Sequence, residues 1–86
     1  MSNFKCKITT PEKVVFEGEI SYLNAETLMG PTGILAHHAP LISPLRAGKV
    51  QLRLPNKTCL DFKVSDGFLK VDNNLAEIFS PEVKTA

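Results

Sequence analysis

Two adjacent histidines, His37 and His38, are the chain's only side chains whose unperturbed charge changes near neutral pH. A histidine general base must therefore be one of them. Ser43 and Ser65 are possible nucleophiles beside such a base. Neither serine lies in the Gly-x-Ser-x-Gly pattern that exposes a nucleophile on a sharp strand-to-helix turn. We therefore predict no catalytic residue and no enzymatic activity.

Metal and cofactor sites are also poorly supported. A zinc site needs closely spaced Cys or His pairs, and consecutive histidines do not easily share one ion. Of the two cysteines, Cys6 alternates with lysines in Phe4–Ile8, so we predict a buried free thiol. The segment Gly30–Gly33 is glycine-rich but lacks the lysine and following helix of a phosphate-binding loop. We expect no metal, no cofactor and no nucleotide binding.

The charges of the chain are nearly balanced, with ten basic and nine acidic residues and a net charge of +1. The basic residues are spread along the sequence with acids between them, and tryptophan is absent. Nucleic-acid-binding proteins usually concentrate positive charge, so we expect no nucleic-acid partner. Glu17 and Glu19 share one face of a predicted strand, and we interpret them as surface charge.

The length of 86 residues predicts one domain, spanning residues 1–86. Hydrophobic residues make up 43% and charged residues 22%, as in globular proteins. No apolar run approaches the roughly 20 residues of a membrane-spanning helix, and the N-terminus lacks the apolar stretch of a signal peptide. We expect no direct membrane insertion, and a cytosolic location unless a partner carries the chain to a membrane.

Apolar residues recur at every second position, which is typical of half-buried strands. Val14, Phe16, Gly18, Ile20 and Tyr22 should share one strand face. The strongest hairpin pairs Val50–Leu54 with Thr58–Val64 around Pro55-Asn56-Lys57. The other predicted strands are Phe4–Thr9, Phe68–Val71 and Leu75–Phe79, with Asp72-Asn73-Asn74 as a tight turn.

Two segments, residues 28–33 and 36–44, break this pattern, and we predict them to be irregular. Pro44 argues against residues 43–45 lying in the middle of a central strand, and Pro81 should stop the final strand near Phe79. Ser65-Asp66-Gly67 indicates a hairpin turn or a bulge where the chain changes sheets. Seven or more short strands predict an all-β fold, either a two-sheet β-sandwich or a flattened barrel.

The irregular segments carry apolar and small residues, such as Met29, Ala39 and Leu41, instead of a catalytic constellation. Loops on a rigid scaffold often carry binding function. The pattern therefore favours a protein-binding surface over an active site.

Four spaced blocks closely resemble the N-terminal domain of the epsilon subunit of F-type ATP synthases, called delta in mitochondria. They are Gly33-Ile34-Leu35, His38-Ala39-Pro40-Leu41-Ile42, Gly48-Lys49-Val50 and Val64-Ser65-Asp66-Gly67-Phe68-Leu69-Lys70-Val71. The segment Thr10–Gly18 also resembles the family's entry into its second strand. The likeness covers nearly the whole chain.

This resemblance implies a sandwich of about ten strands at the foot of the rotating central stalk. Its non-catalytic role would be to link the gamma subunit to the c ring and to couple ion-driven rotation to ATP synthesis. It would be peripheral, at the cytoplasmic face of the energy-transducing membrane. The resemblance implies that the residues that contact the gamma subunit are Thr10, His38, Ala39, Pro40 and Leu41. It also implies that the residues that contact the c ring are Gly30, Pro31 and Thr32.

The sequence departs from the family pattern at three places. Pro31 replaces a residue that is often acidic, which removes an ion pair with the c ring. Ala47-Gly48 replaces a Pro-Gly pair and keeps its glycine. Ala36-His37 replaces another Pro-Gly pair, so His37 should adopt a positive φ if that glycine does.

Full-length relatives continue into an inhibitory helical hairpin that in some cases binds ATP. The seven residues after Phe79 are too few for such a hairpin, because isolated helices under about 12–15 residues are marginal. We therefore expect a non-inhibitory subunit. The alternative is a free-standing adaptor or a lipoyl- or biotinyl-type carrier domain, with Lys57 at a hairpin tip.

Overall fold

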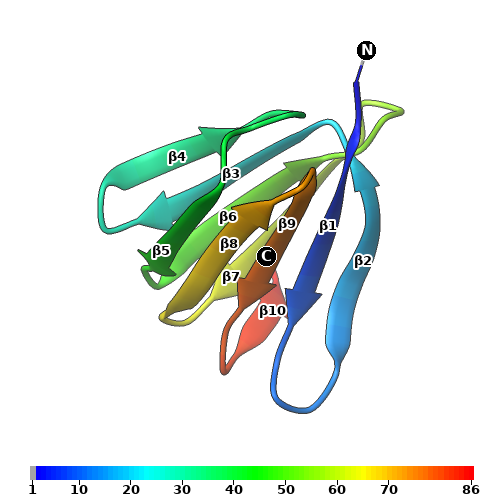
Figure 1. Cartoon of the computed structure of the whole chain (residues 1–86). Coiled ribbons are helices and arrows are strands. Elements are labelled where there is room, and N and C mark those ends of the chain that lie inside the picture. The colour runs from blue at the N-terminus through cyan, green and yellow to red at the C-terminus, as the bar shows by residue number, and fades with distance from the viewer. Residues whose placement is uncertain (1) are drawn as a thin grey trace.

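The computed structural model describes residues 2–86, and its regular structure consists of ten strands (Figure 1). This confirms the predicted all-β fold and the expected strand number. The strands are β1 (Phe4–Thr9), β2 (Val14–Ile20), β3 (Tyr22–Thr27), β4 (Gly30–Ile34), β5 (Leu41–Leu45), β6 (Gly48–Arg53), β7 (Cys59–Val64), β8 (Gly67–Asp72), β9 (Leu75–Phe79) and β10 (Val83–Thr85).

The strands form two layers. One layer runs β10-β7-β6-β3-β4 and the other runs β5-β8-β9-β1-β2. Along one side the layers are joined through β3 and β5, by the pair Thr27 and Leu45. Within residues 2–86 all neighbouring strands are antiparallel except β1 and β9. The result is the predicted two-sheet sandwich, closed along one side into a barrel-like form (Figure 1).

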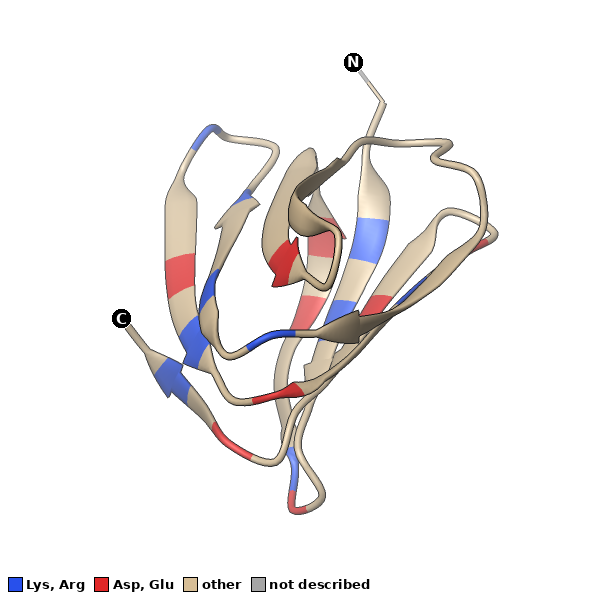
Figure 2. Ribbon diagram, turned by 90° about the vertical axis from the view of Figure 1, so that its left-hand side faces the viewer, with Lys and Arg blue, Asp and Glu red and all other residues tan. Residues whose placement is uncertain are grey.

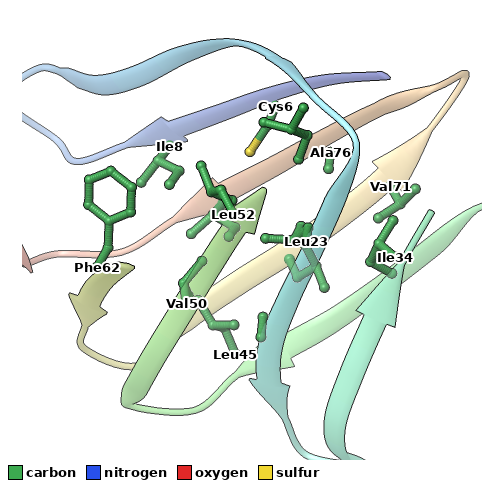
Figure 3. Packing of buried hydrophobic residues seen from close by; sticks show 14 of the residues in the cluster. Cys6, Ile8, Leu23, Ile34, Leu45, Val50, Leu52, Phe62, Val71 and Ala76 are labelled. Atoms are coloured by element: carbon green, nitrogen blue, oxygen red, sulfur yellow. The ribbon is translucent and has the colours of Figure 1, made fainter. Parts of the chain in front are cut away.

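The core lies between the layers, because alternate residues of each strand point inward. Figure 3 shows Val50 and Leu52 of β6 facing inward together with Cys6 and Ile8 of β1. The predicted burial of Cys6 is confirmed, and that burial raises the pKa of its thiol from 9.0 to about 12.

The pairings follow the sequence pattern closely in the second half of the chain. In the predicted β6–β7 hairpin, Val50 lies opposite Phe62 and Leu52 opposite Leu60. Between β8 and β9, Asn73 and Asn74 have positive φ angles of 52° and 62°, which confirms the tight turn. The chain changes layers between β7 and β8, at Ser65–Gly67.

Both segments predicted to be irregular contain strands, so that prediction is wrong in part. Residues 30–34 form β4 against β3, with a turn at Leu28-Met29 and a φ of 98° at Gly30. Residues 41–45 form β5, including Pro44. A proline is tolerated in each strand because, among the described pairings, β4 has one partner and β5 pairs along its length with β8 alone.

Two further predictions need correction. Pro81 does follow the end of β9, but the final strand is β10. In the turn between them the Ser80 hydroxyl donates to the Glu82 carbonyl oxygen at 2.8 Å, and β10 then pairs with β7. Val14 does not share the inward face of β2. A register shift between Ile8 and Thr9 places Val14 opposite Thr9, where it is 45% exposed.

Candidate functional site: an apolar outer face and a hairpin tip

The outer face of the β5-β8-β9-β1-β2 layer carries a row of exposed apolar side chains. Pro44 lies opposite Phe68, Phe68 opposite Phe79, Phe79 opposite Thr9, and Thr9 opposite Val14. Phe68 is 56% exposed and Phe79 is 43% exposed. We call Pro44, Phe68, Phe79 and Val14 the apolar row.

An open hollow of about 440 Å³ lies beside the apolar row. Its walls include Thr10, Pro11, Phe68, Phe79 and Pro81. Contiguous exposed apolar surface of this kind marks protein–protein contacts in soluble proteins. The hollow and the apolar row together form a candidate binding surface at one end of this layer.

Thr10, a predicted gamma contact, lies at the rim of this hollow, but the residue is buried, with 8% of its surface exposed. Its hydroxyl oxygen accepts hydrogen bonds from the amides of Glu12 and Lys13, both at 3.2 Å. It also donates to the carbonyl oxygen of Lys13 at 3.3 Å. Thr10 therefore holds the β1–β2 turn, and its hydroxyl is already engaged within the chain.

The other predicted gamma contacts lie in the β4–β5 loop and at the start of β5. His37 has a φ of 64°, as its replacement of a family glycine predicts, and its amide donates to the Asn74 side-chain oxygen at 2.8 Å. The ring Nδ1 of His38 lies 2.6 Å from the carbonyl oxygen of Ala39, which stabilises the turn. Ala39 and Pro40 are exposed, and Leu41 is half-buried.

Thr10 and this loop lie at opposite ends of the layer and do not form one cluster. Leu41 aligns with Cys6 across β8 and β9, and Thr10 is four residues beyond Cys6. At about 3.3 Å per residue, the two ends are roughly 13 Å apart along the strands. The outer face between them carries Ile42, which is 72% exposed, and the apolar row.

Sequence reasoning missed the apolar row because it looked for binding residues in loops. The signal was nevertheless present in the strands. Phe68 alternates with buried Leu69 and is in phase with exposed Lys70. Phe79 is likewise in phase with Glu77 and out of phase with buried Ile78. A phenylalanine at a position that otherwise carries charge indicates an exposed aromatic side chain.

The predicted c-ring contacts lie at the β3–β4 hairpin, beside an exposed tip. Met29 is 85% exposed and Leu28 is 59% exposed. The hydroxyls of Thr27 and Thr32 lie 3.0 Å apart, and both donate to the carbonyl oxygen of Gly30. The Thr32 hydroxyl is therefore engaged within the hairpin, and Leu28, Met29 and Pro31 supply its outward-facing apolar surface.

Three other features in residues 2–86 would point to a different function: a metal site, a membrane-spanning helix and a carrier lysine. Among residues 2–86, no three His, Cys, Asp or Glu side chains gather to hold a metal ion. The same part of the chain contains no helix long and apolar enough to cross a membrane. Lys57 lies at the tip of the β6–β7 turn with a φ of 74°, where a carrier domain would present its modified lysine.

Known proteins resemble this chain over nearly its whole length. The family model of the ATP synthase delta/epsilon chain β-sandwich domain matches residues 3–86. An ATP synthase epsilon chain of Chlorobium limicola is 39% identical over 80 residues, which cover 93% of this chain and 91% of that relative. The epsilon chain of Stenotrophomonas maltophilia strain K279a is 38% identical over 80 residues, which cover 93% of this chain and 57% of the relative.

Two solved structures share the fold. A chain in the Euglena gracilis mitochondrial ATP synthase structure (OSCP/F1/c-ring, rotational state 1) matches 99% of this chain and 54% of its own, with a TM-score of 0.93 and 17% identity. A chain in the Tetrahymena thermophila mitochondrial ATP synthase structure (central stalk and c ring) matches 92% of this chain and 63% of its own, with a TM-score of 0.77 and 21% identity. The family match and the Chlorobium relative show that the chain belongs to the ATP synthase delta/epsilon chain family and that residues 3–86 form its β-sandwich domain.

Proposed function

We propose that this chain is a non-catalytic central-stalk subunit of an F-type ATP synthase. It links the gamma subunit to the c ring and so couples ion-driven rotation to ATP synthesis. Membership of the delta/epsilon family supports the assembly, and the apolar row is the observation that carries a binding role for this chain. The carrier alternative rests on the position of Lys57 alone.

The gamma subunit binds the outer face of the β5-β8-β9-β1-β2 layer in this proposal. Its contact runs from the hollow near Thr10, across the apolar row, to His38, Ala39, Pro40 and Leu41 in the loop before and at the start of β5. Burial of apolar surface contributes about 25 cal/mol per Å², whereas an exposed ion pair contributes about 0–1 kcal/mol. Gamma binding should therefore depend weakly on salt concentration.

The c ring contacts the β3–β4 hairpin through Gly30, Pro31 and Thr32, together with the exposed tip. Because Met29 and Pro31 occupy this surface, the contact is apolar and involves no ion pair from position 31. The hydroxyls of Thr27 and Thr32 donate hydrogen bonds to the Gly30 carbonyl oxygen and so connect the two strands beside the tip. The subunit is then peripheral, held at the cytoplasmic face of the membrane through the complex.

The test is reconstitution of the chain with the gamma subunit, followed by measurement of the binding affinity at low and high salt. Ala39→Glu and Phe68→Glu each place a charge within the proposed contact, and each should weaken gamma binding by about tenfold or more, since a buried unpaired charge is costly. Thr58→Glu adds the same charge at an exposed position of the other layer and should leave gamma binding unchanged.

Correct folding of each variant is checked by its denaturation curve in the absence of gamma. Undiminished gamma binding by both Ala39→Glu and Phe68→Glu would show that this face is not the gamma contact. A wild-type chain that fails to join the complex, and instead carries a lipoyl group on Lys57, would favour the carrier alternative.

A further inference from the structure

The outer face of the other layer carries three lysines in a single row. Lys49 of β6 lies directly opposite Lys63 of β7, and Lys63 lies directly opposite Lys84 of β10. Side chains of directly opposed residues emerge on the same face of a sheet. We call these residues the lysine row, and Figure 2 shows basic residues side by side on the strands next to the C-terminus.

The surroundings of the lysine row are also basic. Strands β6, β7 and β10 and the β6–β7 turn contain five basic residues and one acid, Asp61, a net charge of +4. The rest of the chain carries five basic residues and eight acids, a net charge of −3. Basic residues that are spread along the sequence therefore gather on one face in three dimensions, because residues far apart in the sequence meet across paired strands.

Little within the chain neutralises the lysine row. Lys49 Nζ lies 3.3 Å from a carboxylate oxygen of Asp61, the one ion pair within 4.0 Å among residues 2–86. Lys63 and Lys84 line an open hollow of about 390 Å³, together with Ser65 and the exposed Glu82. Like charges directly opposite one another in a sheet are destabilising, so the row carries an unfavourable energy in the free chain.

From this row we infer a second docking surface: the lysine row binds an acidic segment of a partner protein. Carboxylates placed between the three ammonium groups would relieve their mutual repulsion. Locally unfavourable arrangements retained in an otherwise consistent fold are typical of functional sites. The inference concerns a face distinct from the apolar row, and it is tested on the isolated chain, so it does not depend on the proposed function.

The spacing of the row fits an acidic α-helix. Adjacent strands lie about 4.8 Å apart, and side chains three or four residues apart on a helix lie about 5–6 Å apart. A helix with glutamates on one face, lying across the strands, therefore presents carboxylates at nearly the lysine spacing.

A lipid surface or a nucleic acid fits this face less well. The large apolar residues exposed in residues 2–86 lie outside β6, β7 and β10, so this face offers no side chain to insert between lipids. The one aromatic residue on these strands, Phe62, is buried and cannot stack on a base.

The test measures binding of the purified chain to a fluorescent alanine-rich helical peptide with glutamates on one face, at low salt. Lys63→Gln should weaken this binding roughly fivefold, the equivalent of about 1 kcal/mol for one exposed pair. Lys7→Gln is the matched control, because it removes the same charge from the other layer and should change binding by less than about twofold.

Three outcomes would overturn the inference. They are equal losses in Lys63→Gln and Lys7→Gln, equal binding of a peptide with the same composition but with glutamates spread around the helix, and tighter binding to phosphatidylserine vesicles or duplex DNA than to the peptide. The stability of each variant, measured in parallel, excludes unfolding as the cause of a loss.

Discussion

The two outer faces of the sandwich differ in the arrangement of their charged residues. On the β5-β8-β9-β1-β2 layer, Lys70 lies opposite Glu77, Glu77 opposite Lys7, and Lys7 opposite Glu17, so charges alternate in sign across four strands. On the β6-β7-β10 face, the corresponding row contains only lysines. Figure 2 shows acidic and basic segments interspersed over most of the chain and basic segments adjacent near its C-terminus.

The two layers therefore expose different kinds of surface without a partner in the chain. On the β5-β8-β9-β1-β2 layer the charges of the Lys70–Glu77–Lys7–Glu17 row cancel. The exposed surface of that layer without a partner is the apolar row beside it. On strands β6, β7 and β10 of the other layer no large apolar side chain is exposed, and the surface without partners is charged. Apolar contact is weakly sensitive to salt, whereas contact with the lysine row should be screened over a Debye length of about 8 Å at physiological salt.

The largest expected effect concerns Gly67, which holds β8 against β9 beneath the apolar row. A Cβ at this position would overlap the carbonyl oxygen of Phe79 and lie 2.9 Å from its carbonyl carbon. Backbone atoms cannot move aside as a flexible side chain can, so Gly67→Ala should lower the free energy of unfolding by roughly 4 kcal/mol or more.

Gly18→Ala is the control for this prediction. Its added Cβ would meet only the Phe16 ring at 3.5 Å, an ordinary contact, and stability should change by less than about 1 kcal/mol. Urea denaturation measures both variants. Equal stability of the two would mean that the approach of Gly67 to β9 does not constrain the fold.

The second prediction compares adjacent residues of β8 that face opposite sides. Leu69 is fully buried, and Leu69→Ala should lower the free energy of unfolding by about 2–5 kcal/mol. Phe68 is 56% exposed, and Phe68→Ser should lower it by about 1 kcal/mol or less while weakening gamma binding. A larger stability loss for Phe68→Ser than for Leu69→Ala would indicate that the apolar row serves folding and not binding.

The alternation of these two residues also shows how much of the fold was predictable from the sequence. Period-two patterning predicted β1 and the β6–β7 hairpin, and the asparagines of Asp72-Asn73-Asn74 predicted the β8–β9 turn, because each depends on local pairing or turn residues. It missed β4 and β5, since Pro31 and Pro44 are compatible with strands only when one side lacks a continuous partner. Pairing partners are a property of the whole sheet, so no local window could reveal them.

The candidate surfaces were predictable to a smaller extent. The family resemblance drew attention to the hairpin at Pro31 and the loop at His38, and His37 has the positive φ that was expected. The apolar row and the lysine row each combine residues from separate strands. Lys49, Lys63 and Lys84 are spread over 36 positions and become neighbours only through two strand registers.

The third prediction compares the two cysteines, one in each layer. Burial raises the pKa of Cys6 from 9.0 to about 12. Below pH 9 the thiol is neutral in both the folded and the unfolded chain, so it makes no pH-dependent contribution. Between pH 9 and about 12 only the unfolded chain releases the proton, and the free energy of unfolding should fall by about 1.4 kcal/mol per pH unit from this group.

Cys6→Ala should remove that part of the alkaline slope, which denaturation curves at pH 9 and pH 11 would measure. Cys59 is exposed on β7, so in the folded chain a thiol reagent should modify Cys59 and leave Cys6 intact until denaturant is added. An unchanged slope in Cys6→Ala, or simultaneous modification of both thiols under native conditions, would contradict the burial of Cys6.

The smallest expected effect is a change in the free energy of unfolding, whose sign should differ between a lysine of one outer face and a lysine of the other. Lys63→Gln removes the central charge of the lysine row, so it should raise the free energy of unfolding by about 0.2–1 kcal/mol. Lys7→Gln removes a lysine that lies opposite both Glu17 and Glu77, and it should lower the free energy of unfolding by a similar amount, about 0.2–1 kcal/mol.

Both substitutions exchange one strand lysine for the same neutral residue, so differences in net charge and side-chain type cancel in the comparison. The two opposite shifts should shrink together in about 1 M salt, where the Debye length falls to about 3 Å. Shifts of the same sign would mean that the cross-strand neighbours do not decide the energy of these lysines. A stabilised Lys63→Gln that also binds the acidic peptide more weakly would show that the lysine row is retained at the expense of stability for the sake of a partner.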